Sequence, residues 1–142
     1  MQPVGGCRHL SKNPLMMAPQ LGISGIAKTF CIVGSILLIM MAVFHGSGYS
    51  YVASAIGESD AENFLKQIVP VLFAHPSIHL IELAAFGILA MFLGPAASKV
   101  LTLLAALIMV DGALAFYLGG ILPGILLFGA ALSFIVASVK IR

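Results

Sequence analysis

Charged residues are scarce in this sequence: Asp, Glu, Lys and Arg together make up 8% of it, and tryptophan is absent. A soluble domain of average composition carries about a quarter of its residues as these four charged types. This number of charged residues is too small to cover a surface that faces water. Most of the chain must therefore be surrounded by lipid or by other apolar protein. This scarcity excludes an ordinary soluble domain.

Several functional patterns are missing as well. The formal net charge is only +2 and the basic residues form no patch, which argues against nucleic acid as a partner. The two cysteines, Cys7 and Cys31, form no CxxC site and no disulfide framework. A GxSxG motif and a glycine-rich phosphate loop are both absent, so nucleophilic enzyme chemistry finds no support. These absences favour a non-catalytic protein.

The chain is instead rich in long apolar runs, and 61% of its residues are hydrophobic. Four runs stand out, at residues 26–45, 76–94, 96–118 and 121–139. Each is close to the roughly 20 residues that a helix needs to cross a hydrocarbon core of about 30 Å. Gly94 and Pro95 separate the second run from the third, and Gly119 and Gly120 separate the third from the fourth. Because these connections are short, consecutive helices must be antiparallel neighbours.

The fold class predicted from these runs is an all-α integral membrane protein, a four-helix antiparallel transmembrane bundle. We expect one membrane domain at residues 26–142, preceded by a tail at residues 1–25 on the cytoplasmic side. The four spans and the short turns between them account for most of that domain. The remaining long connection, residues 46–75, separates the first span from the second.

This long connection has a pattern of its own. Ser59 and Glu62 have the spacing of a helix capping box. Apolar residues then recur at helical spacing: Phe64, Leu65, Ile68 and Leu72. The pattern predicts a short amphipathic helix that lies along the membrane interface between the first and second spans. Because proline favours the first position of a helix, the second span is predicted to begin at Pro76.

Basic residues gather on one side of the predicted bundle. Six of the seven precede the first span, lie at the second turn or follow the fourth span: Arg8, Lys12, Lys28, Lys99, Lys140 and Arg142. The long connection holds the seventh together with three acidic residues. The positive-inside rule therefore places both termini in the cytoplasm, or in the matrix or stroma of an organelle. We expect a multi-pass protein of a bacterial inner membrane or an organellar membrane.

The predicted helices bring five polar side chains to one outer layer of the bundle. These candidate site residues are His45, His75, His79, Glu82 and Asp111. A carboxylate without a partner in hydrocarbon costs about 2.5–3.5 kcal/mol on insertion scales, so Glu82 and Asp111 are expected to face the bundle interior. His79 and Glu82 are three residues apart and share a helix face. A hydrogen-bonded cluster of His79, Glu82 and Asp111 is the simplest assignment.

Three kinds of role fit this layer. It can be structural, with histidines at the polar rim and contacts that join helices. It can bind a cofactor: His45, His79, Glu82 and Asp111 offer ligands for a transition metal, and His45 with His79 or His75 offers axial ligands for haem b. A proton path or small transporter is the third option, although the inner halves of the spans offer hydroxyl groups rather than acids or histidines. We expect a structural layer without a cofactor.

Small residues spaced four apart, such as Ala90 with Gly94 and Gly120 with Gly124, allow membrane helices to approach closely. Four short helices can bury only part of such faces among themselves. The sequence therefore favours a small accessory subunit of a larger membrane complex, for example one with redox or metal chemistry. Its expected partners are the lipid bilayer and other membrane subunits or copies of itself. The alternative is an independent haem-binding or metal-binding protein of electron transfer.

Overall fold

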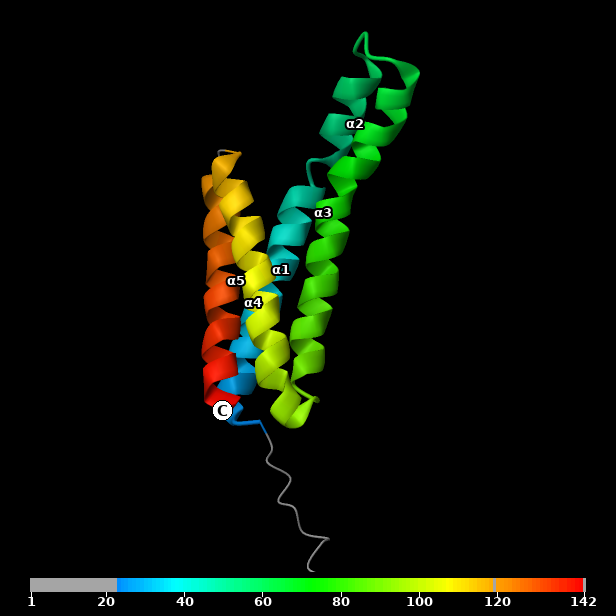
Figure 1. The fold of residues 1–142 in the computed structure, drawn as a ribbon. Coiled ribbons are helices and arrows are strands. Elements are labelled where there is room, and N and C mark those ends of the chain that lie inside the picture. The colour runs from blue at the N-terminus through cyan, green and yellow to red at the C-terminus, as the bar shows by residue number, and fades with distance from the viewer. Residues whose placement is uncertain (1–22, 119, 142) are drawn as a thin grey trace, which may run out of the picture.

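A computed structural model describes residues 23–118 and 120–141, and within these ranges the chain forms helices and no strand. The helices are α1 (Gly25–Gly46), α2 (Tyr49–Gly57), α3 (Asn63–Ala90), α4 (Ala97–Tyr117) and α5 (Ile121–Ile141), with a short 3₁₀ turn at Gly94–Ala96. The helices α1, α3, α4 and α5 are long and apolar enough to cross a membrane. They pack side by side, while α2 lies against the N-terminal part of α3 (Figure 1).

Three of the four apolar runs coincide with helices to within two residues at each end: α1, α4 and α5. At the start of α1, Ser24 Oγ accepts a hydrogen bond of 3.2 Å from the Ala27 N–H. Before α4 the chain turns at Gly94, whose φ of 57° lies in the left-handed region that glycine adopts without strain. Most of the predicted tail, residues 1–22, lies outside the described residues, as do Arg8, Lys12 and Arg142.

The second apolar run differs from its prediction. The helix α3 begins at Asn63 and continues through Pro70 and Pro76 to Ala90, a helix of 28 residues, whereas the sequence predicted a new helix at Pro76. Proline usually ends or kinks a helix because it lacks an N–H donor and its ring crowds the preceding turn. Here α2 packs along α3 and Pro70 is buried. Contact with a neighbouring helix is one of the features that let a helix continue through proline.

The predicted capping box at Ser59 and Glu62 is not formed. Ser59 Oγ donates to the Ile56 carbonyl at 2.7 Å and accepts from the Ala61 N–H at 3.3 Å, so this serine follows α2 instead of starting α3. Glu62 directly precedes α3, but its side chain accepts no capping hydrogen bond from the described residues. The prediction of a separate amphipathic helix is therefore wrong in its bounds, because the residues of that helix form the first turns of α3. The helix α2 was not predicted.

The packing of the bundle centres on Phe134 of α5, whose side chain is fully buried. Gly34 of α1 and Gly87 of α3 lie against its ring. A Cβ atom added at Gly34 would be 2.8 Å from Phe134 Cζ, and one added at Gly87 would be 2.6 Å from Phe134 Cε1. Both positions require glycine, because a real Cβ atom essentially never approaches another heavy atom within 3.0 Å. One aromatic ring thereby joins three helices.

Buried hydroxyl groups join the helices as well. Ser138 Oγ of α5 donates to the Ser98 carbonyl of α4 at 3.0 Å and lies 2.8 Å from Thr102 Oγ1. Ser35 Oγ of α1 donates to the Ala84 carbonyl of α3 at 3.0 Å. Hydrogen bonds of this kind between hydroxyl side chains and neighbouring helices are typical of helix packing in membranes.

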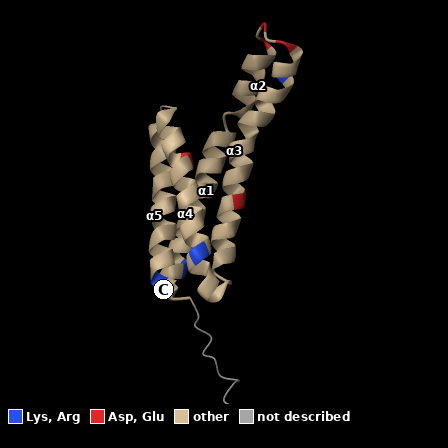
Figure 2. Cartoon of the chain, viewed as in Figure 1, with Lys and Arg blue, Asp and Glu red and all other residues tan. Residues whose placement is uncertain are grey.

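The charged residues divide between the two ends of the molecule (Figure 2). One end holds the lysines near the start of α1, the start of α4 and the end of α5: Lys28, Lys99 and Lys140. The other end is the tip between α2 and α3, where three acidic residues lie: Glu58, Asp60 and Glu62. Two further acids, Glu82 and Asp111, lie along α3 and α4 between these ends.

Candidate functional site

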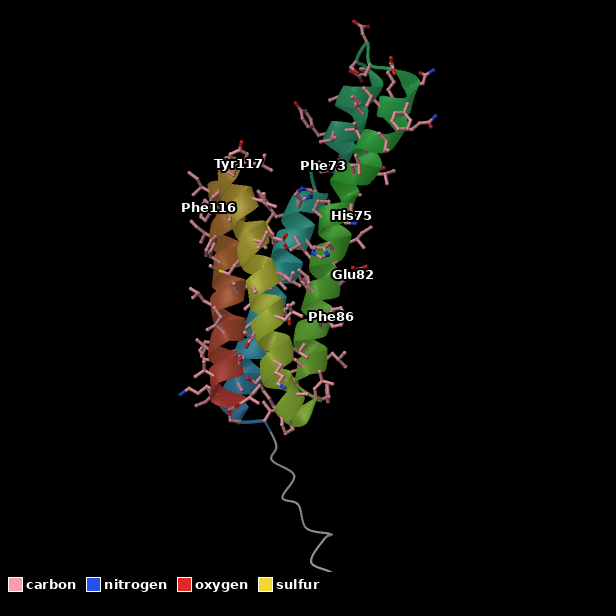
Figure 3. All side chains as sticks on the ribbon, viewed as in Figure 1. Phe73, His75, Glu82, Phe86, Phe116 and Tyr117 are labelled. Atoms are coloured by element: carbon pink, nitrogen blue, oxygen red, sulfur yellow. The ribbon has the colours of Figure 1, made fainter. Side chains whose placement is uncertain are left out.

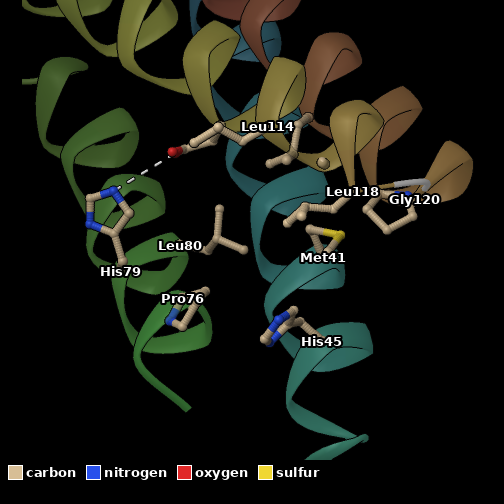
Figure 4. Close-up of a pocket in the computed structure, with 12 residues that line it drawn as sticks. Met41, His45, Pro76, His79, Leu80, Leu114, Leu118 and Gly120 are labelled. Atoms are coloured by element: carbon tan, nitrogen blue, oxygen red, sulfur yellow. Dashed lines mark ion pairs between the residues drawn. The ribbon is translucent and has the colours of Figure 1, made fainter. Parts of the chain in front are cut away.

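A pocket of about 410 Å³ lies between the long helices, near the end of α1 and the end of α4 (Figure 4). Its walls come from α1, α3, α4 and α5, and most of the side chains that line it are apolar. Three polar side chains also line it: His45, His79 and Asp111. Contact between α3 and α4 is much less extensive than contact between α3 and α1, which leaves room for this space. We call it the α3–α4 pocket.

His79 and Asp111 face each other across the α3–α4 pocket. Nε2 of His79 lies 3.8 Å from Oδ2 of Asp111, the pair that Figure 4 joins by a dashed line. A hydrogen bond between nitrogen and oxygen needs about 2.7–3.2 Å, so this contact is electrostatic and not a hydrogen bond. Oδ2 of Asp111 is buried and has no hydrogen-bond partner among the described residues. The structure places these two members of the predicted cluster of three near each other, without the predicted hydrogen bond, and leaves a carboxylate oxygen unsatisfied.

His45 reaches the same pocket from the last turn of α1. Its Nδ1 lies 3.2 Å from Ser77 Oγ, within hydrogen-bond distance. Its ring also stacks on Phe73, with ring centroids 4.5 Å apart and an interplanar angle of 22°. Both contacts are with α3, so they fix the end of α1 and the orientation of this histidine relative to α3.

Glu82 lies outside the pocket, and here the prediction is wrong. Its side chain is exposed and points away from the other helices (Figure 3), whereas the sequence predicted that it faces the interior beside His79 and Asp111. The reason is rotation about the helix axis. The buried side of α3 consists of residues spaced three or four apart: Leu80, Leu83, Ala84 and Gly87. At 100° per residue Glu82 falls nearly opposite that stripe.

His75 lies on the same outer side of α3 and is exposed. Its ring stacks with that of His79 one turn further along, with centroids 6.3 Å apart and an interplanar angle of 13°. His79 stands at the edge of the buried stripe, between His75 on the outer side and Asp111 in the pocket. The predicted polar layer is therefore divided, with His45, His79 and Asp111 on the pocket and His75 and Glu82 outside it.

The predicted metal ligands do not converge. No group of three or more His, Cys, Asp or Glu side chains within residues 23–118 and 120–141 could hold a metal ion. Of the predicted set, His79 and Asp111 approach each other, while His45 lies against Ser77 and Glu82 is directed outward. The metal site is therefore without support in this geometry, and haem b binding stays a prediction.

The apolar wall of the pocket was not predicted from the sequence. It includes Leu114 and Leu118 near the end of α4 and Pro123 in the first turn of α5. These residues look like ordinary span residues in the sequence, because the pocket arises only from the way α3 and α4 diverge. The sequence pattern of a single helix therefore does not predict a pocket between helices.

Comparisons of this chain with protein-family models, with curated proteins and with solved structures found no match. Its function is therefore inferred from its own residues and their geometry.

Proposed function

We propose that this protein is a small multi-pass membrane subunit that binds a second membrane protein through the outer face of α3. We define this face by the exposed residues His75, Ile78, Glu82 and Phe86. The observation that carries the proposal is the exposed carboxylate of Glu82, which lies within a helix long and apolar enough to cross a membrane.

The depth of Glu82 makes this exposure costly. Glu82 precedes Ala90, the last residue of α3, by eight residues (90 − 82). At 1.5 Å per residue this separation is about 12 Å, which is near the middle of a hydrocarbon core of about 30 Å. An acid without a partner at that depth costs about 2.5–3.5 kcal/mol. Within the described part of the chain no ion pair or hydrogen bond involves Glu82. A partner that covers this side chain would remove the cost.

Charge complementarity indicates what the partner carries. The described lysines lie at the two ends of the molecule, three at the end near the C-terminus and Lys66 near the acidic tip. A second copy that lies parallel to the first would therefore present no lysine at the depth of Glu82. A helix of another membrane protein with lysine or arginine in its apolar segment would pair with it. The apolar side chains of Ile78 and Phe86 supply the surrounding contact area.

Photo-crosslinking at position 86 tests this proposal. A photoreactive amino acid in place of Phe86 is expected to form one discrete adduct in the membranes of the cells that make the protein. Glu82→Gln should reduce that adduct at least tenfold, because removing one partner of a buried charge pair costs about 3–5 kcal/mol. The measurement is the adduct yield on a gel, followed by mass spectrometry of the crosslinked peptide.

The matched control carries the same photoreactive group at Leu103, which is 63% exposed on α4, and it should give no such adduct. The crosslinked peptide should come from an apolar segment that contains lysine or arginine. An adduct with a second copy of this chain, an adduct that Glu82→Gln leaves unchanged, or the absence of any adduct would each contradict the proposal.

We further propose that α1, α3, α4 and α5 cross the membrane as an antiparallel bundle with both termini on the cytoplasmic side. The support is the distribution of charge in Figure 2, with three of the four described lysines at the end of the molecule where α5 ends, and Lys66 with three acids near the α2–α3 tip. Positive charge is retained on the cytoplasmic side of membranes, whereas acidic residues have little influence.

Cysteine labelling with a maleimide that does not cross membranes checks this topology. Asp60→Cys, made in a Cys7→Ser background, should be labelled in intact cells or organelles, because residue 60 lies at the tip between α2 and α3. The native Cys7 should be labelled only after lysis. Cys31 is fully buried and should not react in either case. Labelling of residues 7 and 60 from the same side would rule out the proposed arrangement.

A further inference from the structure

The α3–α4 pocket has the size and lining of a small-molecule site. Its volume of about 410 Å³ falls within the range of about 300–1,000 Å³ that such sites span. Leu80, Leu114 and Leu127 are among the apolar residues of its wall. A ligand that fills this space must present a largely hydrocarbon body to these side chains. The pocket is not enclosed and is partly open at the surface of the molecule.

The polar groups of the pocket indicate which polar group a ligand would need to carry. Among the described residues that line the pocket, Asp111 is the one acid, and none is a lysine or an arginine. Its Oδ2 atom is buried and accepts no hydrogen bond from the described residues. The Asp111 side chain as a whole is 31% exposed, and its carboxylate gains most from a donor that reaches it through the pocket and also carries positive charge. An ammonium group has both properties, whereas an alcohol can donate but leaves the charge uncompensated.

A ligand head in the pocket can reach both Asp111 and His79. Their side chains are 31% and 42% exposed, and Nε2 of His79 lies 3.8 Å from Oδ2 of Asp111, so a group bound at the carboxylate lies close to the imidazole. A primary ammonium has enough N–H groups to donate to the carboxylate and to the imidazole nitrogen. Both side chains line the pocket.

We propose that the α3–α4 pocket binds a small lipid-soluble primary amine, with the ammonium at the exposed part of the Asp111 carboxylate, next to His79, and the hydrocarbon body against the leucines of the wall. This inference goes beyond the proposed function, because it uses the pocket side of α3 and not the outer face that carries Glu82. The two can therefore fail independently.

The test compares two probes with the same body. 4-Phenylbutylamine and 4-phenylbutanol differ only in the head group, and each is titrated by calorimetry into the full-length protein in lipid nanodiscs. Heats from empty nanodiscs are subtracted. The amine should bind saturably, one molecule per chain, and at least tenfold more tightly than the alcohol. Asp111→Asn should weaken amine binding at least tenfold, since a hydrogen bond to a charged group is lost, and should change alcohol binding little.

Two further variants serve as controls for the binding site. Glu82→Gln removes an acid of similar depth outside the pocket and should leave amine binding unchanged, while Leu114→Trp fills the pocket and should abolish binding of both probes. Equal affinity for amine and alcohol, or amine binding that Asp111→Asn leaves intact, would overturn the proposal. If the Asp111→Asn variant does not fold, the Leu114→Trp variant decides: amine binding as tight as in the wild type would overturn the proposal. Loss of the Phe86 adduct in Glu82→Gln, with amine binding retained, would support both proposals.

Discussion

Phe134→Ala is expected to destabilise the folded bundle by about 2–3 kcal/mol, the cost of a cavity of about 100 Å³ at about 24 cal/mol per Å³. The ring is fully buried between Gly34 and Gly87, so three helices lose contacts at once. The loss should be smaller than the 3–5 kcal/mol typical of this substitution in soluble proteins, since separated helices in lipid keep their apolar surroundings. Reversible unfolding in mixed micelles, followed by circular dichroism, measures the difference.

The matched control is Phe92→Ala. Phe92 is 78% exposed, and its truncation should change the free energy of unfolding by no more than about 0.5 kcal/mol. An equal loss of stability in both variants would show that Phe134 is not the centre of the packing.

Gly87→Ala is expected to destabilise the bundle by about 3 kcal/mol, the upper end of the range for overpacked cores. The new methyl group would lie 2.6 Å from both Phe134 Cε1 and Ser35 Oγ, so side chains of two helices would have to move. The serine is held by its hydrogen bond to the Ala84 carbonyl and cannot turn away without losing it. The same unfolding measurement applies.

Gly129→Ala provides the comparison for this substitution. A Cβ atom at Gly129 would lie 3.4 Å from Leu37 Cδ1, an ordinary contact, so stability should stay the same or rise by up to about 1 kcal/mol through helix propensity. Combining Gly87→Ala with Phe134→Leu should cost less than the sum of the two single changes, because the smaller side chain makes room for the methyl group. Strictly additive losses would contradict the contact.

The sequence predicts the helices of this protein better than their orientation. Apolar runs with glycine and serine at their ends place α1, α4 and α5 to within two residues. The prediction failed at Pro76 because proline's effect on a helix is local, whereas the packing of α2 on α3 is a tertiary contact. No pattern in the connecting segment predicts that α2 exists and lies there.

In the candidate site, too, the sequence predicts which layer a residue lies in better than the direction of its side chain. Counting residues along two helices puts His79, Glu82 and Asp111 in one outer layer, and of these the structure places His79 and Asp111 3.8 Å apart. Depth alone carries no information on rotation about the helix axis, so the prediction for Glu82 was wrong. The spacing of Leu80, Leu83 and Gly87 marks the buried side of α3 and could have predicted the exposure of Glu82. The pocket depends on how far α3 and α4 separate, which no single helix encodes.

The two prolines of α3 limit how deeply this helix can sit in a bilayer. Pro70 and Pro76 have no N–H to donate to the carbonyls four residues earlier, those of Lys66 and Leu72. Water or lipid headgroups can satisfy these carbonyls, whereas hydrocarbon cannot, so in the proposed membrane bundle these prolines favour a hydrocarbon boundary near Leu72. From Leu72 to Ala90 the helix rises over 18 residues (90 − 72), about 27 Å and close to the roughly 30 Å of a hydrocarbon core.

With this boundary, the first turns of α3 and the helix α2 would lie among headgroups or in water, together with the acidic tip. Glu82, ten residues (82 − 72) below this boundary, is about 15 Å from it and about as far from water as any position that the helix offers.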